Sequence, residues 1–260
     1  MKMPPKNIKN KLENLYKRYN QPKYIHPDPV EFLYLYKDIK DRELVGLIAS
    51  SLAYGRVKQI LKSVSCVLDS MTPSPRLFLK ESTHSSMCEV FKGFRHRFAN
   101  GDHIAALLQG IKSVIDQYGS LNDCFVRGIS DDDRNIIPAL NFFTTALRVG
   151  NSNAGHLIAL PEKGSACKRM NLFLRWMIRK DRVDPGGWSG VPVSKLIIPL
   201  DTHMHKIGIK LGFTAKQHAN MLTALEITTG FRQITPDDPV KYDFVLTRFG
   251  IRDDMDIDNL

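Results

Sequence analysis

The sequence predicts an all-α protein, and three observations support this fold class. Apolar residues recur every three or four positions over most of the 260-residue chain, which is the spacing of one face of an amphipathic helix. Proline or glycine separates these periodic stretches and marks the expected helix ends. No run of strict apolar and polar alternation, the pattern of a strand ladder, interrupts them.

Residues 1–100 contain three expected helical regions. Residues 8–20 have helical apolar spacing and precede a proline-rich connection at 22–29. Residues 41–71 have the strongest periodicity, and Gly55 divides them into two helices. Three phenylalanines lie among cations at 91–98, and their spacing favours the half-buried face of a helix. The alternative for this segment is contact with nucleic acid.

Further helices are expected at 103–118, which Gly119 closes, and at 135–149. The acidic run 131–133 is interpreted as a solvated turn, because a divalent cation needs ligands that converge on one point. Another helix is expected from Ser165, as N-cap, through Arg179. One arc of this helix is apolar and the opposite arc is basic, so a core-packed helix with an exposed basic face is expected. The apolar arc holds Met170, Phe173, Leu174 and Met177, and the basic arc holds Lys168, Asn171, Arg175 and Arg179.

Composition limits the class of protein. The hydrophobic content of 43% suffices for one large domain or two interleaved subdomains with a core. The net charge of +10 and the pI near 9.4 favour a polyanionic partner, because neutralising phosphates releases counterions. A basic protein without a nucleic-acid role is the alternative.

Cysteine spacing and hydropathy argue against several other classes. The four cysteines form no close pair, so neither a zinc site nor an iron–sulfur cluster is expected, and we predict no metal or other cofactor. No apolar run approaches the roughly 20 residues that span a bilayer, and the basic N-terminal segment does not resemble a secretory signal. We therefore expect a cytoplasmic protein without membrane contact. The cysteines are Cys66, Cys88, Cys124 and Cys167.

Two stretches carry the candidate chemistry. Residues 160–165 form a tight turn that opens a helix, and the free amides of a helix start can bind an anion such as phosphate. The apolar run 197–200 leads into Asp201, which directly precedes another expected helix. Asp201 is therefore either an N-cap or an acid held at a functional site.

These stretches resemble the helix-hairpin-helix-Gly/Pro-Asp superfamily of base-excision DNA glycosylases. LPEKGSACK is similar to its hairpin motif, and PLDTHMHKIGIKLG is similar to its apolar run that ends in the essential aspartate. NLFLRWMIR and DPVKYDFVLTRFGI make the archaeal 8-oxoguanine glycosylase branch the closest fit. The chain also resembles a bacterial family without an assigned activity that shares GSACKRMNLFLRWMIR and DPVKYDF. The resemblance covers residues 42–251 approximately.

The resemblance implies a catalytic role for Asp201, which would stabilise an oxocarbenium-like transition state. Family members that also cleave the strand have a lysine two residues after the second hairpin glycine, where this chain has Ala166. The archaeal branch has its lysine where this chain has Arg175. Lys168 is the nearest lysine and shares a helical face with Arg175, so it is the expected nucleophile. Glu162 replaces the first hairpin glycine.

The same resemblance implies the remaining site and the architecture. Residues 42–190 would form a central helical bundle with the hairpin, residues 1–41 and 191–260 a second lobe, and the cleft between them the site. The expected DNA-binding residues are Lys163, Gly164, Ser165, Arg169, Arg175 and Arg179. The expected base-pocket residues are Trp176, Trp188, His203 and Asp243.

The implied function is excision of a damaged base, an oxidised purine such as 8-oxoguanine. Attack by Lys168 would add abasic-site lyase activity, whereas attack by water would give a monofunctional glycosylase. The expected partner is double-stranded DNA that contains a modified base, bound by a monomeric protein located with the nucleoid. Two alternatives stay open. One is a non-catalytic DNA- or RNA-binding protein, which Glu162 favours, and the other is an enzyme that processes RNA bases in the same cleft.

Overall fold

The computed structural model describes residues 7–148 and 154–248, which are mostly helical. The predicted all-α class is therefore confirmed for this part of the chain. Its only sheet pairs two-residue strands, Arg95–His96 (β1) and Ala99–Asn100 (β2), in antiparallel orientation.

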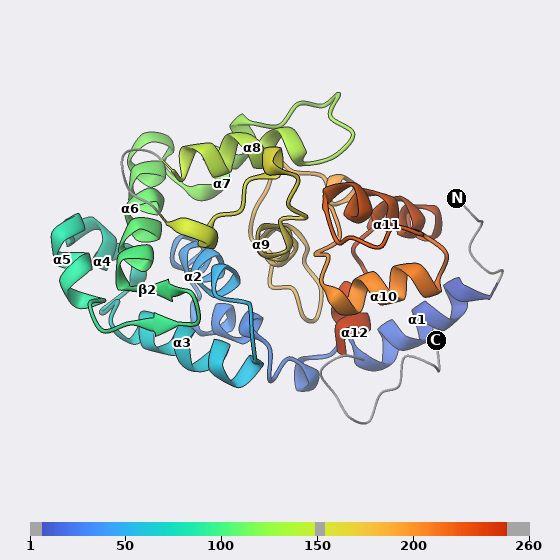
Figure 1. Cartoon of the computed structure of the whole chain (residues 1–260), viewed down its shortest axis with the longest axis horizontal. Helices are drawn as coiled ribbons and strands as arrows, with labels where there is room; N and C mark the ends of the chain where they lie inside the picture. The colour runs from blue at the N-terminus through green and yellow to red at the C-terminus, as the bar shows by residue number, and fades with distance from the viewer. Residues whose placement is uncertain (1–6, 149–153, 249–260) are drawn as a thin grey trace.

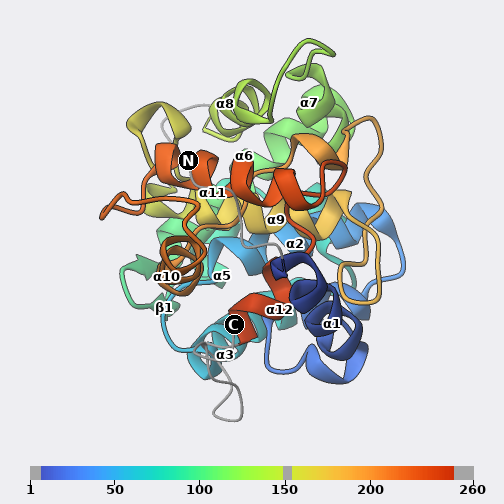
Figure 2. The same cartoon turned by 90° about the vertical axis from the view of Figure 1, so that its right-hand side faces the viewer.

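Helices gather on two sides of a central helix, α9 (Lys168–Ile178), as Figures 1 and 2 show. One side holds α2 (Ile39–Ser51), α3 (Val57–Asp69), α4 (Pro75–Glu81), α5 (His84–Val90), α6 (Gly101–Tyr118), α7 (Leu121–Arg127) and α8 (Ile137–Ala146). The other side holds α1 (Ile8–Tyr19), α10 (Thr202–Lys210), α11 (Met221–Ile234) and α12 (Asp243–Thr247). Short 3-10 turns are η1 (Pro22–Tyr24), η2 (Pro29–Leu35), η3 (Gly155–Leu157), η4 (Pro161–Lys163) and η5 (Val193–Lys195).

The two sides share their interior. Buried apolar side chains from both form one continuous cluster. The segment η2, which we expected in the second lobe, packs along α2 of the bundle instead. On the second side, α12 contacts both α1 and α10, so the two ends of the described chain close over the same core.

Helix α9 is enclosed on more than its apolar arc. Asn171, Arg175 and Arg179 are exposed by only 1%, 2% and 4%, although they were expected on a solvent-facing basic arc. That prediction is wrong for these three residues, because the loop after α9 and the segments that hold Asp238 and Asp243 supply carboxylates to the two arginines, and Asn171 donates to the Ala166 carbonyl. Periodicity identifies the apolar side of a helix, but it does not show what packs on the other side.

Most expected helices are confirmed. Helix α1 matches 8–20, and α6 matches 103–118 with Gly119 at its C-cap at φ +91. The 41–71 stretch breaks into α2 and α3 around Gly55, whose φ of +95 favours glycine. Helix α8 is shorter than the expected 135–149, and residue 149 lies outside the described residues.

The helix expected at 91–98 is wrong, because a turn follows α5 at 91–93 and the β1–β2 hairpin begins at Arg95. Arg97 adopts a left-handed conformation at φ +52 and turns the chain back on itself. Phe91 and Phe94 are buried, as a core role predicts, whereas Phe98 is 73% exposed. The 3.6-residue spacing of the phenylalanines therefore reflects two core residues and one residue at the hairpin turn.

Candidate functional site

A cavity of about 760 Å³ lies among segments from both sides of the molecule. Its wall is formed by the start of η2, the connection between α2 and α3, one face of α9, the start of α10 and helix α12. The residues of the cavity that carry chemistry are Asp28, Tyr54, Lys168, Arg175, Asp201, His203, Asp243 and Arg248.

Asp201 both caps a helix and lines this cavity. Its Oδ1 accepts hydrogen bonds from the amides of His203 at 3.0 Å and Met204 at 2.8 Å, which fixes the carboxylate at the start of α10. The preceding residues Leu196–Leu200 are buried and hold the backbone that delivers it. The cap uses one carboxylate oxygen and leaves Oδ2 for a second interaction.

That second interaction is with Lys168. The Nζ atom of Lys168 lies 3.6 Å from Asp201 Oδ2, and the two side chains are 36% and 19% exposed. Lys168 is the first residue of α9, because Cys167 occupies the N-cap position at φ +47. The predicted N-cap at Ser165 is therefore wrong by two residues; its Oγ instead accepts a hydrogen bond from the Cys167 amide at 3.2 Å.

Asp243 lies in the same cavity and is 1% exposed. Its Oδ2 pairs with Nη1 of Arg175, while its Oδ1 is buried without a hydrogen-bond partner among the described residues. Burial raises the pKa of Asp243 to about 6, against the lowering effect of Arg175 and with a further upward contribution from Asp201. A carboxyl that binds a proton near neutral pH thus shares the cavity with Asp201.

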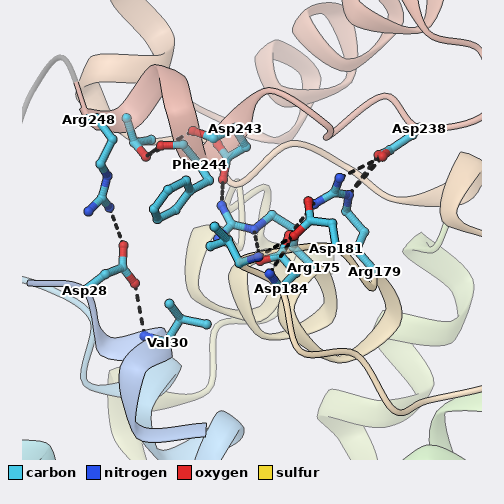
Figure 3. Close-up of polar contacts among 12 residues, drawn as sticks. Asp28, Val30, Arg175, Arg179, Asp181, Asp184, Asp238, Asp243, Phe244 and Arg248 are labelled. Atoms are coloured by element: carbon cyan, nitrogen blue, oxygen red, sulfur yellow. Dashed lines mark hydrogen bonds and ion pairs between the residues drawn. The ribbon is translucent and has the colours of Figure 1, made fainter. Parts of the chain in front are cut away.

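A network of ion pairs surrounds the C-terminal end of α9 (Figure 3). Arg175 Nε contacts Asp184 Oδ1 at 3.2 Å, and Arg179 contacts Asp184, Asp181 and Asp238. Burial raises the pKa of Asp184, while both arginines oppose this shift. Figure 3 shows these side chains directed at one another.

This network corrects the predicted DNA-binding set. Arg175 and Arg179 are paired within the core and are not placed to meet a phosphate at the surface. Arg169 is also engaged, since its guanidinium donates to the carbonyls of Ser51, at 2.8 Å, and His156 and lies over the Tyr54 ring. These three arginines therefore pair with groups inside the protein, some of them in the loop directly after α9 and others far away in the chain.

The two tryptophans expected in the base pocket belong to the core. Trp176 is 0% exposed and is not among the cavity residues. Trp188 packs against Phe125 and Phe173 and donates its indole N–H to Glu43 Oε2 at 3.0 Å. Both base-pocket predictions are therefore wrong, because the two indole rings fill the core and are not available to stack on a base.

The expected hairpin residues Lys163, Gly164 and Ser165 are exposed, and so is Glu162. Gly164 has φ +74 and closes the η4 turn through its amide, and its carbonyl accepts from the Met221 amide at 3.2 Å. The described residues just before this turn form only the short segment η3. The turn is thus an exposed loop tied to the start of α11.

The sequence alone did not identify three further cavity residues. Asp28 and Arg248 form an ion pair, and Arg248 Nε is buried without a hydrogen-bond partner among the described residues. The hydroxyl of Tyr54 donates to the His96 carbonyl at 2.9 Å and accepts from His156 Nε2 at 2.8 Å. Two patterns in the sequence could have pointed to these residues. They are the Asp28-Pro29 pair, in which Asp28 caps η2, and the Tyr54-Gly55 pair between two helices.

Comparison with known families gives one match. The profile of a family described as a protein of unknown function, DUF2400, matches residues 28–252. The chain belongs to this family. No curated protein matches the chain. No solved structure matches it either.

The described part of the chain has neither a clustered set of metal-binding side chains nor a membrane-spanning helix. Residues 7–148 and 154–248 contain no group of three or more His, Cys, Asp or Glu side chains arranged to hold a metal ion. Within the same ranges, every helix is too short or too polar to cross a membrane. The cavity residues named above offer carboxylates, an amine, guanidinium groups, a phenol and an imidazole.

Proposed function

We propose that this protein is a base-excision DNA glycosylase that also cleaves the strand at the resulting abasic site. The observation that carries the proposal is the pairing of Lys168 Nζ with Asp201 Oδ2 at 3.6 Å in the cavity wall. A lysine beside a carboxylate supplies a nucleophile and a proton acceptor in one place. The resemblance of the Asp201 segment to the glycosylase aspartate motif supports the same assignment.

The cavity suits a base turned out of the double helix. Its volume of about 760 Å³ lies within the roughly 300–1,000 Å³ of small-molecule sites. An enzyme that acts on a base within a duplex must extrude the nucleotide to reach the glycosidic bond. The net charge of +10 supports binding to the phosphate backbone. We propose an oxidised purine such as 8-oxoguanine as the substrate.

The reaction follows from the two side chains. The neutral amine of Lys168 attacks C1′ of the sugar, and the bond from C1′ to the base breaks with its electron pair passing to the base. Asp201 stabilises the positive charge that develops on the sugar and accepts the proton that the amine loses. Opening of the sugar ring then gives a Schiff base on Lys168, from which the 3′ phosphate is eliminated.

Borohydride trapping tests this proposal directly. Borohydride reduces a Schiff base to a stable amine, so the protein incubated with a duplex that contains one 8-oxoguanine should become covalently attached to the DNA. Lys168→Gln should abolish the adduct. Lys180→Gln, which makes the same substitution at an exposed lysine outside the cavity and outside the expected DNA-binding residues, should keep it.

Two results would contradict the proposal. A panel of duplexes with other damaged bases, and one with a preformed abasic site, extends the trapping experiment beyond 8-oxoguanine. Binding to these duplexes without base release or adduct formation would support the non-catalytic binding protein instead. An adduct that persists in Lys168→Gln would show that another amine is the nucleophile.

A further inference from the structure

Asp243 has no assigned role in the reaction above, although it shares the cavity with Asp201. We propose that Asp243 is the general acid that protonates the departing base during excision. This inference rests on the proposed function, because it concerns the same glycosidic bond. It divides the work between two carboxyl groups, with Asp201 serving the sugar and Lys168, and Asp243 serving the leaving group.

The first argument is the state of the two carboxylate oxygens. Oδ2 of Asp243 is held by Arg175, which fixes the orientation of the side chain (Figure 3). Oδ1 is buried and has no hydrogen-bond partner among the described residues, yet the side chain lines the cavity. A buried polar atom without a partner is costly, and it is expected where a ligand completes the interaction.

The second argument is the charge balance of the network. Four carboxylates, Asp181, Asp184, Asp238 and Asp243, surround only two guanidinium groups, those of Arg175 and Arg179. Such an excess of buried negative charge favours binding of a proton.

Hydrogen bonding decides which carboxylate takes that proton. Both oxygens of Asp184 pair with guanidinium groups, and Asp181 accepts from two backbone amides and from the Tyr16 hydroxyl. Asp238 is partly solvated. Only Asp243 combines near-complete burial with an unpartnered oxygen, so the proton belongs on its Oδ1.

The surroundings of Asp243 agree with this assignment. The charged groups that act on it are Arg175 on α9, Asp184 in the following loop and Asp201 at the start of α10. Burial, Asp201 and Asp184 raise the pKa of Asp243 to about 6, whereas Arg175 lowers it. A buried carboxyl group with a raised pKa, in the same cavity as a carboxylate that faces a lysine, suits the role of general acid.

The proton and electrons balance in the step. The O–H bond at Asp243 Oδ1 breaks as its proton passes to a ring nitrogen or exocyclic oxygen of the base. The electron pair of the glycosidic bond passes to the base, which leaves neutral, and C1′ forms its bond to Lys168 Nζ. The amine then loses a proton to Asp201, and Asp243 regains its proton from water.

The test separates excision from abasic-site chemistry, because a preformed abasic site has no base to protonate. The two substrates are a duplex with one 8-oxoguanine and the same duplex with an abasic site. Asp243→Asn should lower single-turnover excision by about 100-fold, a typical loss for a general acid, while borohydride trapping on the abasic duplex changes by less than about threefold. Asp116→Asn makes the same substitution at an exposed position on α6, outside the cavity, and should retain wild-type excision.

The pH dependence gives a second readout. A general acid must be protonated, so the ratio of the excision rate to the abasic trapping rate should fall as pH rises above the Asp243 pKa of about 6. Taking the ratio cancels the separate requirement for an unprotonated Lys168. Asp243→Asn should remove this fall from whatever excision it retains.

Three results would overturn the inference. Unchanged excision in Asp243→Asn would show that Asp243 gives no proton. An equal loss of excision and abasic trapping would show that it only maintains the structure. Wild-type protein that forms no adduct on either duplex would overturn the proposed function itself, and with it this role for Asp243.

Discussion

Lys168 Nζ lies 3.6 Å from Asp201 Oδ2, whereas Asp201 Oδ1 is held by two amides at the start of α10. The longer distance exceeds that of a hydrogen bond, so the lysine is attracted to the carboxylate but is not fixed by it. Oδ1 thus holds the aspartate rigidly in place. Oδ2 faces the side chain of Lys168, which can reorient. This asymmetry allows the capping role of Asp201 to be separated from its proposed catalytic role.

Substitutions at Asp201 should separate these roles. Asp201→Asn keeps an oxygen that can cap α10, so its unfolding free energy should stay within about 0.5 kcal/mol of wild type, while excision falls at least about 100-fold. Asp201→Ala also loses the cap and should unfold about 1 kcal/mol more easily. Urea denaturation and single-turnover excision measure the two effects. Wild-type excision by Asp201→Asn would contradict the catalytic assignment.

The proposed function predicts that the η4 turn contacts DNA, and a substitution at Glu162 tests this contact. This exposed acid beside Lys163 repels phosphate, so Glu162→Lys should increase affinity for duplex DNA and steepen its dependence on salt concentration. Glu81→Lys makes the same charge change at an exposed position on α4 and is the matched control. Fluorescence anisotropy at several salt concentrations gives both quantities. Equal gains in the two variants would mean that overall charge, and not the hairpin, governs binding.

The buried network should make Arg179 essential for stability. Arg179→Met leaves Asp184, Asp181 and Asp238 without their shared cation, and removal of one partner from a buried ion pair costs roughly 3–5 kcal/mol. Lys180→Met, at the exposed neighbouring position, should change the unfolding free energy by less than about 0.5 kcal/mol. Chemical denaturation provides the comparison. A small effect at Arg179 would show that water screens this network.

Asp243 should also affect stability as a function of pH. Its folded pKa of about 6 exceeds the ordinary aspartate pKa of 3.8, so the folded protein binds more protons than the unfolded chain between these pH values. Stability from this group is therefore present below about pH 4 and decreases as pH rises toward 6. Asp243→Asn resembles the neutral acid and should lack this decrease. Urea denaturation at several pH values gives the unfolding free energy of wild type and of Asp243→Asn. A difference between the two that does not change with pH would show that Asp243 ionises normally.

The sequence by itself determined the helices and the position of Asp201. Apolar spacing predicted α1, α2, α3 and α6, because local periodicity decides which face of a helix becomes buried. The apolar run before Asp201 predicted an acid at the start of α10, since capping is a contact between near neighbours in the chain.

Only the tertiary structure decided what the polar and aromatic side chains do. Arg175 meets Asp243 across 68 residues, and Trp188 meets Glu43 across 145, so no local pattern could distinguish internal pairing from DNA contact or base stacking. The same long-range packing brings Lys168 and Asp243 to the cavity that Asp201 lines. Charge and ring type are properties of a residue, whereas burial and partners are properties of the fold that surrounds it.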